Sequence, residues 1–286
     1  GETPLGVSKD CIDDYLCAET GLPVTLCNCP GHTTHTGLLA ELNNRDPRLL
    51  QTVCSPEAGE HTYYLKGHPA NIANIVNTGA GGSSSTGYSI AKFYNAAEHL
   101  AAHHQGTLDA PVFRFGEILL IRAEAAAELG TISQTDLDAT VNKLRERVGF
   151  NHKLTMSPAV DPKLEAEYPN VSANNATLIR EIRRERRVEL FGEGYRFDDL
   201  RRWACGKRLD ASVAPRMGMI PDAKLYSAEN ITAMQNVLGT NSKGELDIYS
   251  KRVDTQARFE DPKNYLFAIP TNEISINPNL TQNTGW

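Results

Sequence analysis

The stretch Leu178–Trp203 constrains this chain more than any other. Read as a helix with about 100° of rotation per residue, it places four apolar side chains on one side: Leu178, Ile179, Ile182 and Leu190. The same sector also contains three charged residues: Glu185, Arg186 and Glu189. Because an unpaired buried charge destabilises a protein strongly, these side chains must either be paired inside the protein or face water.

Two glycines predict where this helix ends. Gly192 and Gly194 can supply the positive φ that a helix C-terminal cap requires. A second, short helix is expected after them, because Phe197, Leu200 and Trp203 recur three residues apart. The two helices should pack against each other as a loose hairpin.

A second helical hairpin is expected upstream. Residues 114–129 are almost all apolar or alanine apart from a single stripe, Glu117, Glu124 and Glu128, so this helix should be buried on most sides. Ser133 and Asp136 have the spacing of a capping box, and one apolar seam follows within 135–148. The sequence thus predicts a mainly α fold of tetratricopeptide-like helical hairpins with extensive irregular loops and a few short strands. The expected helices are 114–129, 135–148, 176–191 and 196–204.

The remaining segments show weaker patterns. Short helices are expected around Lys9–Thr20, at Leu38–Leu42 and around Ile231–Leu238, and strands at 49–53, 61–66 and 246–250. The Gly/Ser-rich segment 79–87 predicts a mobile loop, and 158–175 a Pro/Asn-rich connection. The last residues are rich in turn formers, so they should stay ordered only through hydrogen bonds from their Asn and Gln side chains to the backbone of the body.

The six cysteines leave two interpretations open. Cys27, Cys29, His32 and His35 lie within nine residues, but this spacing differs from that of the common zinc modules. Loop cysteines are therefore favoured over a metal site, and no metal is expected. An oxidised pair would suit an exported protein, and its candidates are Cys11, Cys17, Cys27, Cys29 and Cys54.

Several functional classes are disfavoured. The net charge of −6 argues against a nucleic-acid binder, and the glutamates within the basic run 183–187 favour a salt-bridge lattice there. No apolar run is long enough to span a bilayer. Adjacent Asp198 and Asp199 would point about 100° apart on a helix, so they cannot flank one glycosidic bond. Without a hydrolase or metalloprotease motif either, we predict no enzyme activity and no cofactor.

The signature EIRRERRVELFGEGYRFDDLRRW (181–203) resembles that of the SusD/RagB family, the surface nutrient-binding lipoproteins of Bacteroidetes. Three further stretches agree with it in order: NNRDPRLLQTV (43–53), VFRFGEILLIRAEAAAELG (112–130) and YLFAIPTNEISINPNLTQNTGW (265–286). Proteins of that family are nearly twice as long, so the chain resembles their C-terminal half. The whole of 1–286 would be one portion of a single domain, with 1–110 loop-rich and 111–286 carrying the helical repeats and the C-terminal signature.

The resemblance implies a function. The family captures a glycan at the cell surface and delivers it to an outer-membrane transporter of the SusC type, with no chemistry and no cofactor. It also implies the extracellular face of the outer membrane, reached through an N-terminal lipid anchor that would lie upstream of this chain. Peptide uptake, associated with RagB-like members, and a helical scaffold that binds only protein remain alternatives.

The resemblance carries over no ligand residue by motif, so candidates come from the loops. Sugar rings are held by aromatic faces and a few polar groups, and the loop tyrosines are Tyr63, Tyr64, Tyr94, Tyr168, Tyr226 and Tyr249. Within the structural signature, Trp203 and the C-terminal Trp286 are expected to be buried. We further expect Arg122, or failing it Arg186, to neutralise Glu185 or Glu189, and the Asp46–Arg48 turn to be held by its own ion pair.

Overall fold

The computed structural model describes residues 6–33, 37–56, 84–93, 111–251 and 256–286, and the single positions 73, 75, 107 and 109. The expected strand 61–66, most of the expected loop 79–87 and three candidate ligand residues lie outside this part: Tyr63, Tyr64 and Tyr94. Within it the fold is mainly helical, and its only β contacts are isolated bridges, such as the one between Cys17 and Arg45. None of the helices in these ranges has the length and apolar character that a bilayer crossing requires.

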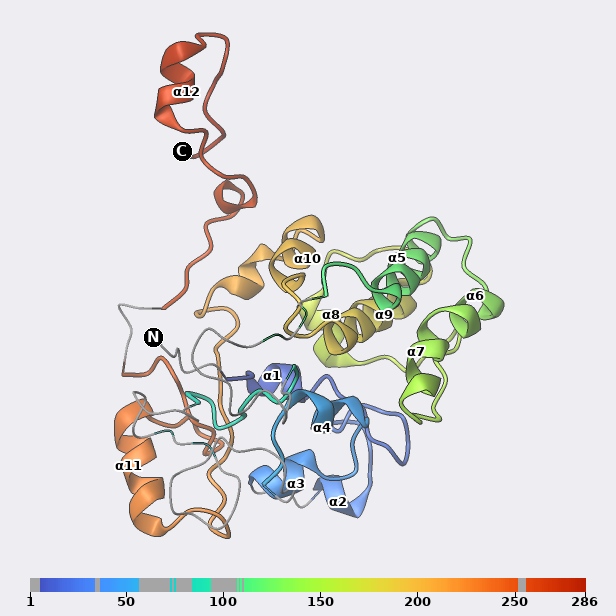
Figure 1. The fold of residues 1–286 in the computed structure, drawn as a ribbon, viewed down its shortest axis with the longest axis vertical. Helices are drawn as coiled ribbons and strands as arrows, with labels where there is room; N and C mark the ends of the chain where they lie inside the picture. The colour runs from blue at the N-terminus through green and yellow to red at the C-terminus, as the bar shows by residue number, and fades with distance from the viewer. Residues whose placement is uncertain are drawn as a thin grey trace.

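The helical hairpins form one side of the molecule (Figure 1). They comprise α5 (Phe115–Glu128), α6 (Gln134–Ala139), α7 (Val141–Arg147), α8 (Pro162–Glu167), α9 (Ala176–Glu189) and α10 (Arg196–Arg202). Their shared core contains Leu120, Leu137, Ile179 and Leu200. The helices expected at 114–129, 176–191 and 196–204 are confirmed, whereas the one expected at 135–148 is divided at Thr140, where φ is −126° and ψ is −91°.

A second core lies beneath the hairpins in Figure 1. Around it are short helices: α1 (Lys9–Ile12), α2 (Pro30–Thr33), α3 (Leu38–Leu42), α4 (Arg48–Thr52) and α11 (Ala228–Leu238). Ile12, Leu49 and Tyr88 belong to this second core, and so does Val188 of α9, although Ile182 of the same helix belongs to the first. Helix α9 therefore contributes side chains to both cores. It is surrounded by other segments, so the charged side chains of the signature stretch are buried along with its apolar ones.

Several expectations about local structure are wrong. Where a strand was expected at 49–53, residues 48–52 form α4 and Val53 takes part only in a bridge with Ile90. The Asp46 carboxylate accepts a hydrogen bond from the Arg48 amide in the turn that leads into α4. The connection 158–175 contains α8, which Asp161 caps and Pro162 starts. Residues 246–250 take part only in single bridges, one of them between Thr240 and Leu246. The helix around Lys9–Thr20 is limited to α1.

Helix α5 buries part of its glutamate stripe together with apolar residues such as Leu120 and Ala123. Its glutamate stripe faces α9 and α10, so that Glu117 and Glu124 are buried. Three other apolar side chains of α5 are exposed: Phe115, Ile118 and Ile121. The expectation that α5 is buried on most sides is therefore wrong within the described chain. The reason is electrostatic: α9 and α10 present arginines, and carboxylates on the facing side of α5 pair with them.

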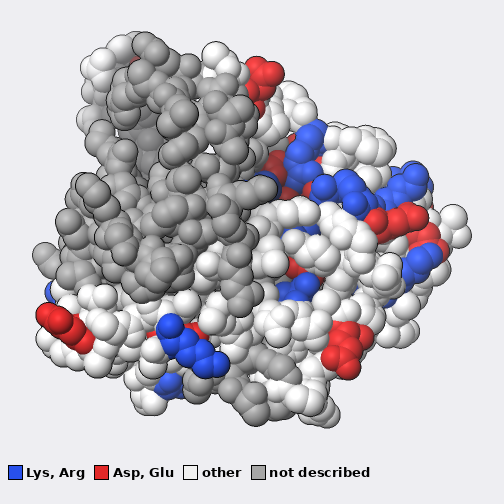
Figure 2. Space-filling model, turned by 60° about the horizontal axis from the view of Figure 1, so that its bottom comes forward, with Lys and Arg blue, Asp and Glu red and all other residues white. Residues whose placement is uncertain are grey.

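The basic run of α9 is a salt-bridge lattice, as the sequence indicated. Arg183 pairs with Glu128, Arg184 with Asp161 and Glu181, Arg186 with Asp199, and Arg187 with Asp10 and Asp14. These four arginine side chains are at most 10% exposed. On the part of the surface that Figure 2 describes, basic and acidic side chains likewise lie next to one another. These four arginines of α9 therefore form ion pairs within the protein and have little surface left to contact an external ligand.

The C-terminal residues extend away from the two cores as a separate arm that ends near α12 (Thr271–Ile276; Figure 1). Its polar side chains hydrogen-bond backbone of the arm itself: Gln282 bonds both the amide and the carbonyl of Ile269, and Asn283 donates to Phe267. Trp286 is 48% exposed, so the expectation that it is buried is wrong. Its indole bonds the carbonyls of Lys263 and Leu266 within the arm and reaches neither core.

Candidate functional site

The two glutamates in the apolar sector of α9 are buried and paired. Arg48 of α4 lies 2.6 Å from Glu185 and 3.1 Å from Glu189. The other partners are Arg145 of α7 for Glu185, and Arg147 of α7 and Arg114 before α5 for Glu189. Both glutamate side chains are only 2% exposed. The charged sector of α9 is therefore a structural tie between α4, α5 and α7.

The partners expected from the sequence are wrong. Arg122 is 62% exposed and pairs with Asp136, 2.8 Å away. Arg186 is buried, but its Nε donates to both carboxylate oxygens of Asp199. Arg122 cannot reach the glutamates because it lies on the solvent side of α5, opposite the stripe that faces α9.

Arg48 is the partner of Glu185 and Glu189 that the sequence did not predict, although the sequence did predict that Arg48 pairs with Asp46 in its own turn. The expected ion pair within its turn is confirmed, since Arg48 Nη2 lies 2.6 Å from Asp46 Oδ2. Burial alone would raise the pKa of Glu185, but the guanidinium groups of Arg145 and Arg48 outweigh it and lower this pKa to about 2. One arginine thus holds the turn before α4 and the middle of α9 together.

Trp203 has the buried structural position expected of it, with 5% of its surface exposed. Its indole Nε1 donates to Glu124 Oε1 at 2.6 Å, and Arg202 pairs with the same carboxylate. The Arg183 guanidinium lies over its ring, 4.7 Å from the centroid. Trp203 therefore fixes α10 on α5 and is not available to a ligand.

The loop tyrosines do not form a common site. Tyr168 is fully buried against Trp203, with ring centroids 5.6 Å apart. Tyr226 is buried in the second core, where its hydroxyl donates to the Ala73 carbonyl at 3.1 Å. Neither can offer a ring face to a sugar, which corrects both assignments. Tyr249 is partly exposed in the loop after the Thr240–Leu246 bridge, and it does not line the pocket described next.

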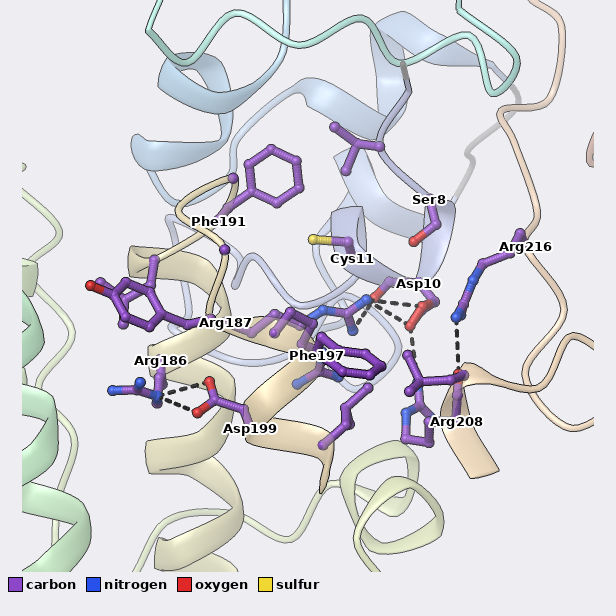
Figure 3. A pocket seen from close by; sticks show the side chains of 18 of the residues that line it. Ser8, Asp10, Cys11, Arg186, Arg187, Phe191, Phe197, Asp199, Arg208 and Arg216 are labelled. Atoms are coloured by element: carbon purple, nitrogen blue, oxygen red, sulfur yellow. Dashed lines mark hydrogen bonds and ion pairs between the residues drawn. The ribbon is translucent and has the colours of Figure 1, made fainter. Parts of the chain in front are cut away.

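A pocket of about 430 Å³ opens where the signature stretch meets the start of the described chain (Figure 3). Its walls come from the residues at α1, from the turn between α9 and α10, and from the segment after α10. In Figure 3 the rings of Phe191 and Phe197 lie on opposite sides of the space, and Ser8, Asp10 and Cys11 close another side. The volume is within the range of about 300–1,000 Å³ that small-ligand sites occupy.

Some charged side chains at this pocket are paired with an opposite charge within the described chain, and Arg216 is not. Asp10 is bound by Arg187 and Arg208, each at 2.9 Å, and these cations with Lys163 lower its pKa although burial opposes them. Arg216 instead donates to the carbonyls of Arg208 and Ala214 and is in no ion pair with a described carboxylate. Burial lowers the pKa of Arg216. Its guanidinium can therefore donate to oxygen atoms of a ligand, as arginine side chains do readily.

The pocket offers no set of groups for catalysis among its lining residues. Asp10 and Asp199 are both held by arginines, so neither is free to act as a general acid or base. Burial raises the pKa of the Cys11 thiol to about 11, which leaves little thiolate to act as a nucleophile. The arrangement suits binding by ring stacking and hydrogen bonds.

One group in the described chain could hold a metal ion. Cys17, Cys27, Cys29 and His32 lie with their ligand atoms within 4.8 Å of one another. The sequence pattern had drawn attention to Cys27, Cys29 and His32 but not to Cys17, which comes from ten residues earlier. His35 lies outside the described residues.

The comparisons with known proteins agree on one family. The model of the SusD family matches residues 4–286. A solved SusD-like carbohydrate-binding protein from Bacteroides fragilis superposes with a TM-score of 0.66 at 22% identity, covering 96% of this chain and 48% of that one. A second SusD-like protein from Bacteroides fragilis gives a TM-score of 0.62 at 22% identity, with 98% and 47% covered. None of the curated proteins compared matches this chain.

These matches cover nearly all of this chain but only part of the solved structures. The family match runs from the first described residues to the C-terminus and includes the signature that holds the two cores together. The chain spans about half the length of the solved structures it resembles. SusD family proteins are non-catalytic binding proteins, and this chain belongs to the SusD family.

Proposed function

We propose that this protein binds a glycan at the extracellular face of the outer membrane and passes it to a SusC-like TonB-dependent transporter. The observation that carries this proposal is the family match over residues 4–286. A relative of the same fold is described as a carbohydrate-binding protein. Attachment to the membrane would be through a lipid anchor, and binding would need no cofactor.

The pocket in Figure 3 has the chemistry that such binding requires. Phe197 is 42% exposed at its edge, so its ring face can stack on a sugar ring. Arg216 and Ser8 line the same space and can donate hydrogen bonds to sugar hydroxyl groups. We therefore place a glycan subsite there, with Phe197 as its stacking residue.

Phe197→Ala is expected to weaken glycan binding about tenfold, or ~1.4 kcal/mol, because it removes the ring that stacks on the sugar. Since Phe197 is not a core residue, the substitution should leave the fold intact. The matched control is Phe113→Ala, which removes another exposed phenylalanine, 82% exposed and outside the pocket. Affinity electrophoresis against a panel of polysaccharides, followed by calorimetry on those that retard the protein, measures both. If the two variants bind the glycan equally well, Phe197 does not contact the glycan.

The same experiment separates glycan binding from the alternatives. A peptide library run in parallel tests the RagB-like alternative, in which peptides bind and polysaccharides do not. If neither class binds but the SusC-like partner does, the protein is an interaction scaffold. Each of these two results would overturn the proposed glycan function.

Prolonged incubation with any glycan that binds should leave the glycan intact. The carboxylates at the pocket are occupied by arginines, and no described group there combines a nucleophile with an acid–base partner. Chromatography of the glycan before and after incubation measures this. Cleavage that disappears in an Asp10→Asn or Asp199→Asn variant would show that this reasoning is wrong.

A further inference from the structure

Four potential metal ligands converge outside the lining of the glycan pocket, in the segment 17–32, which reaches into α2 and precedes α3. Cys17 Sγ and Cys29 Sγ are 3.6 Å apart, and Cys27 Sγ is 2.9 Å from His32 Nδ1. All four residues are buried, with at most 7% of their surface exposed. We propose that Cys17, Cys27, Cys29 and His32 bind one zinc ion as a closed structural site.

The distances fit tetrahedral coordination. Zinc binds cysteine sulfur at about 2.3 Å and histidine nitrogen at about 2.0 Å, which separates neighbouring ligand atoms by roughly 3.5–3.8 Å. The ligand atoms here lie within 4.8 Å of one another, so small side-chain rotations bring them onto a tetrahedron. Three thiolates and one imidazole form a ligand set that favours zinc over magnesium or calcium. With four protein ligands no position remains for a substrate, so the site is structural.

The surroundings of the ligands orient them as metal sites require. The second ring nitrogen of His32 lies 3.2 Å from the Asn43 carbonyl oxygen, which can accept its proton and leave Nδ1 to bind a metal.

A disulfide accounts for less of what is observed. A bond between Cys17 and Cys29 would use two of the four groups and leave Cys27 and His32 in contact with it for no reason. The hydrophobic cluster of this segment is small: it consists of Cys17, Cys27 and Cys29, with Leu22 packed against them. A bound metal would add stability to so small a cluster, as metals do in small domains.

Zinc measured by mass spectrometry on the full chain, purified with its thiols reduced, should amount to one ion per chain. Cobalt(II) substituted for zinc should give the strong visible absorption of a tetrahedral site with thiolate ligands. Cys29→Ser should lower zinc affinity at least tenfold. The matched control is Cys54→Ser, which changes another buried cysteine whose thiol lies near the Ile90 carbonyl, outside the group. This control should retain the metal.

A readout on the unsubstituted protein covers the case in which Cys29→Ser does not fold. Removal of zinc with a chelator should lower the melting temperature, and added zinc but not magnesium should restore it. Three results would overturn the proposal: no zinc bound by the reduced protein after reconstitution, zinc retained in Cys29→Ser, or a Cys17–Cys29 disulfide in protein alkylated directly in cells. Glycan binding is measured separately, so failure here leaves the proposed function standing.

Discussion

Glu189→Ala is expected to lower the free energy of unfolding by about 3–5 kcal/mol, because it removes a buried carboxylate that three guanidinium groups share. Arg48, Arg114 and Arg147 all point their charged groups at Glu189, at 2.6–3.1 Å. Arg48 keeps Asp46 and Glu185 as partners, but it is almost fully buried, so water cannot replace the negative charge that Glu189 supplies there. The effect should be much larger than the cost of losing one hydrogen bond.

The matched control is Glu128→Ala, at the far end of the glutamate stripe on α5. Glu128 is 45% exposed and makes a single ion pair, at 3.2 Å with Arg183. A pair of this kind contributes about 0–1 kcal/mol. Urea unfolding followed by circular dichroism measures both variants, and Glu189→Gln separates the loss of charge from the loss of volume. If Glu189→Ala and Glu128→Ala prove equally mild, the charged sector of α9 is not a structural tie.

The sequence alone predicted which side chains of α9 are unusual but not what they contact. Helical periodicity places Glu185 and Glu189 among apolar residues, and burial follows from that placement. Their shared partner Arg48 lies 141 residues before Glu189, and no local pattern reports a contact at such a distance. Periodicity also misled the assignment of Arg122, because α5 turns its carboxylates as well as apolar residues such as Leu120 towards α9, and Arg122 lies on the opposite, exposed side.

The same limit applies to the candidate sites. Tyr168 and Tyr226 were chosen because they follow no helical seam, yet the loops that carry them pass through the cores, where both rings are buried. The Cys/His group was rejected on spacing within one segment. The fourth residue of the group, Cys17, is brought to it by the bridge with Arg45 and by a turn at Gly21, where φ is +69°. Spacing rules describe ligands that share a hairpin or a helix, and this group shares neither.

Acid should destabilise the protein more steeply than its exposed carboxylates alone would. The pKa of Glu185 is about 2 in the folded protein, against its ordinary value of 4.5, because Arg145 and Arg48 outweigh the effect of burial. Lys163 and Arg187 similarly lower the pKa of the buried Asp14 below 3.8. Since the unfolded chain then takes up protons before the folded one, stability present above about pH 4.5 is lost as the pH falls towards 2.

Glu185→Gln tests this dependence, because glutamine keeps the volume of the side chain and cannot ionise. At neutral pH the variant should be less stable than the unsubstituted protein, since Arg48 and Arg145 lose a buried counter-charge. The difference should then narrow steadily as the pH falls from about 4.5 towards 2, where Glu185 itself becomes protonated. Glu146→Gln, on the exposed side of α7 and in no ion pair with a described residue, should follow the unsubstituted protein throughout. A difference between Glu185→Gln and the unsubstituted protein that stays constant over this range would mean that Glu185 does not supply the acid-sensitive part of the fold's stability.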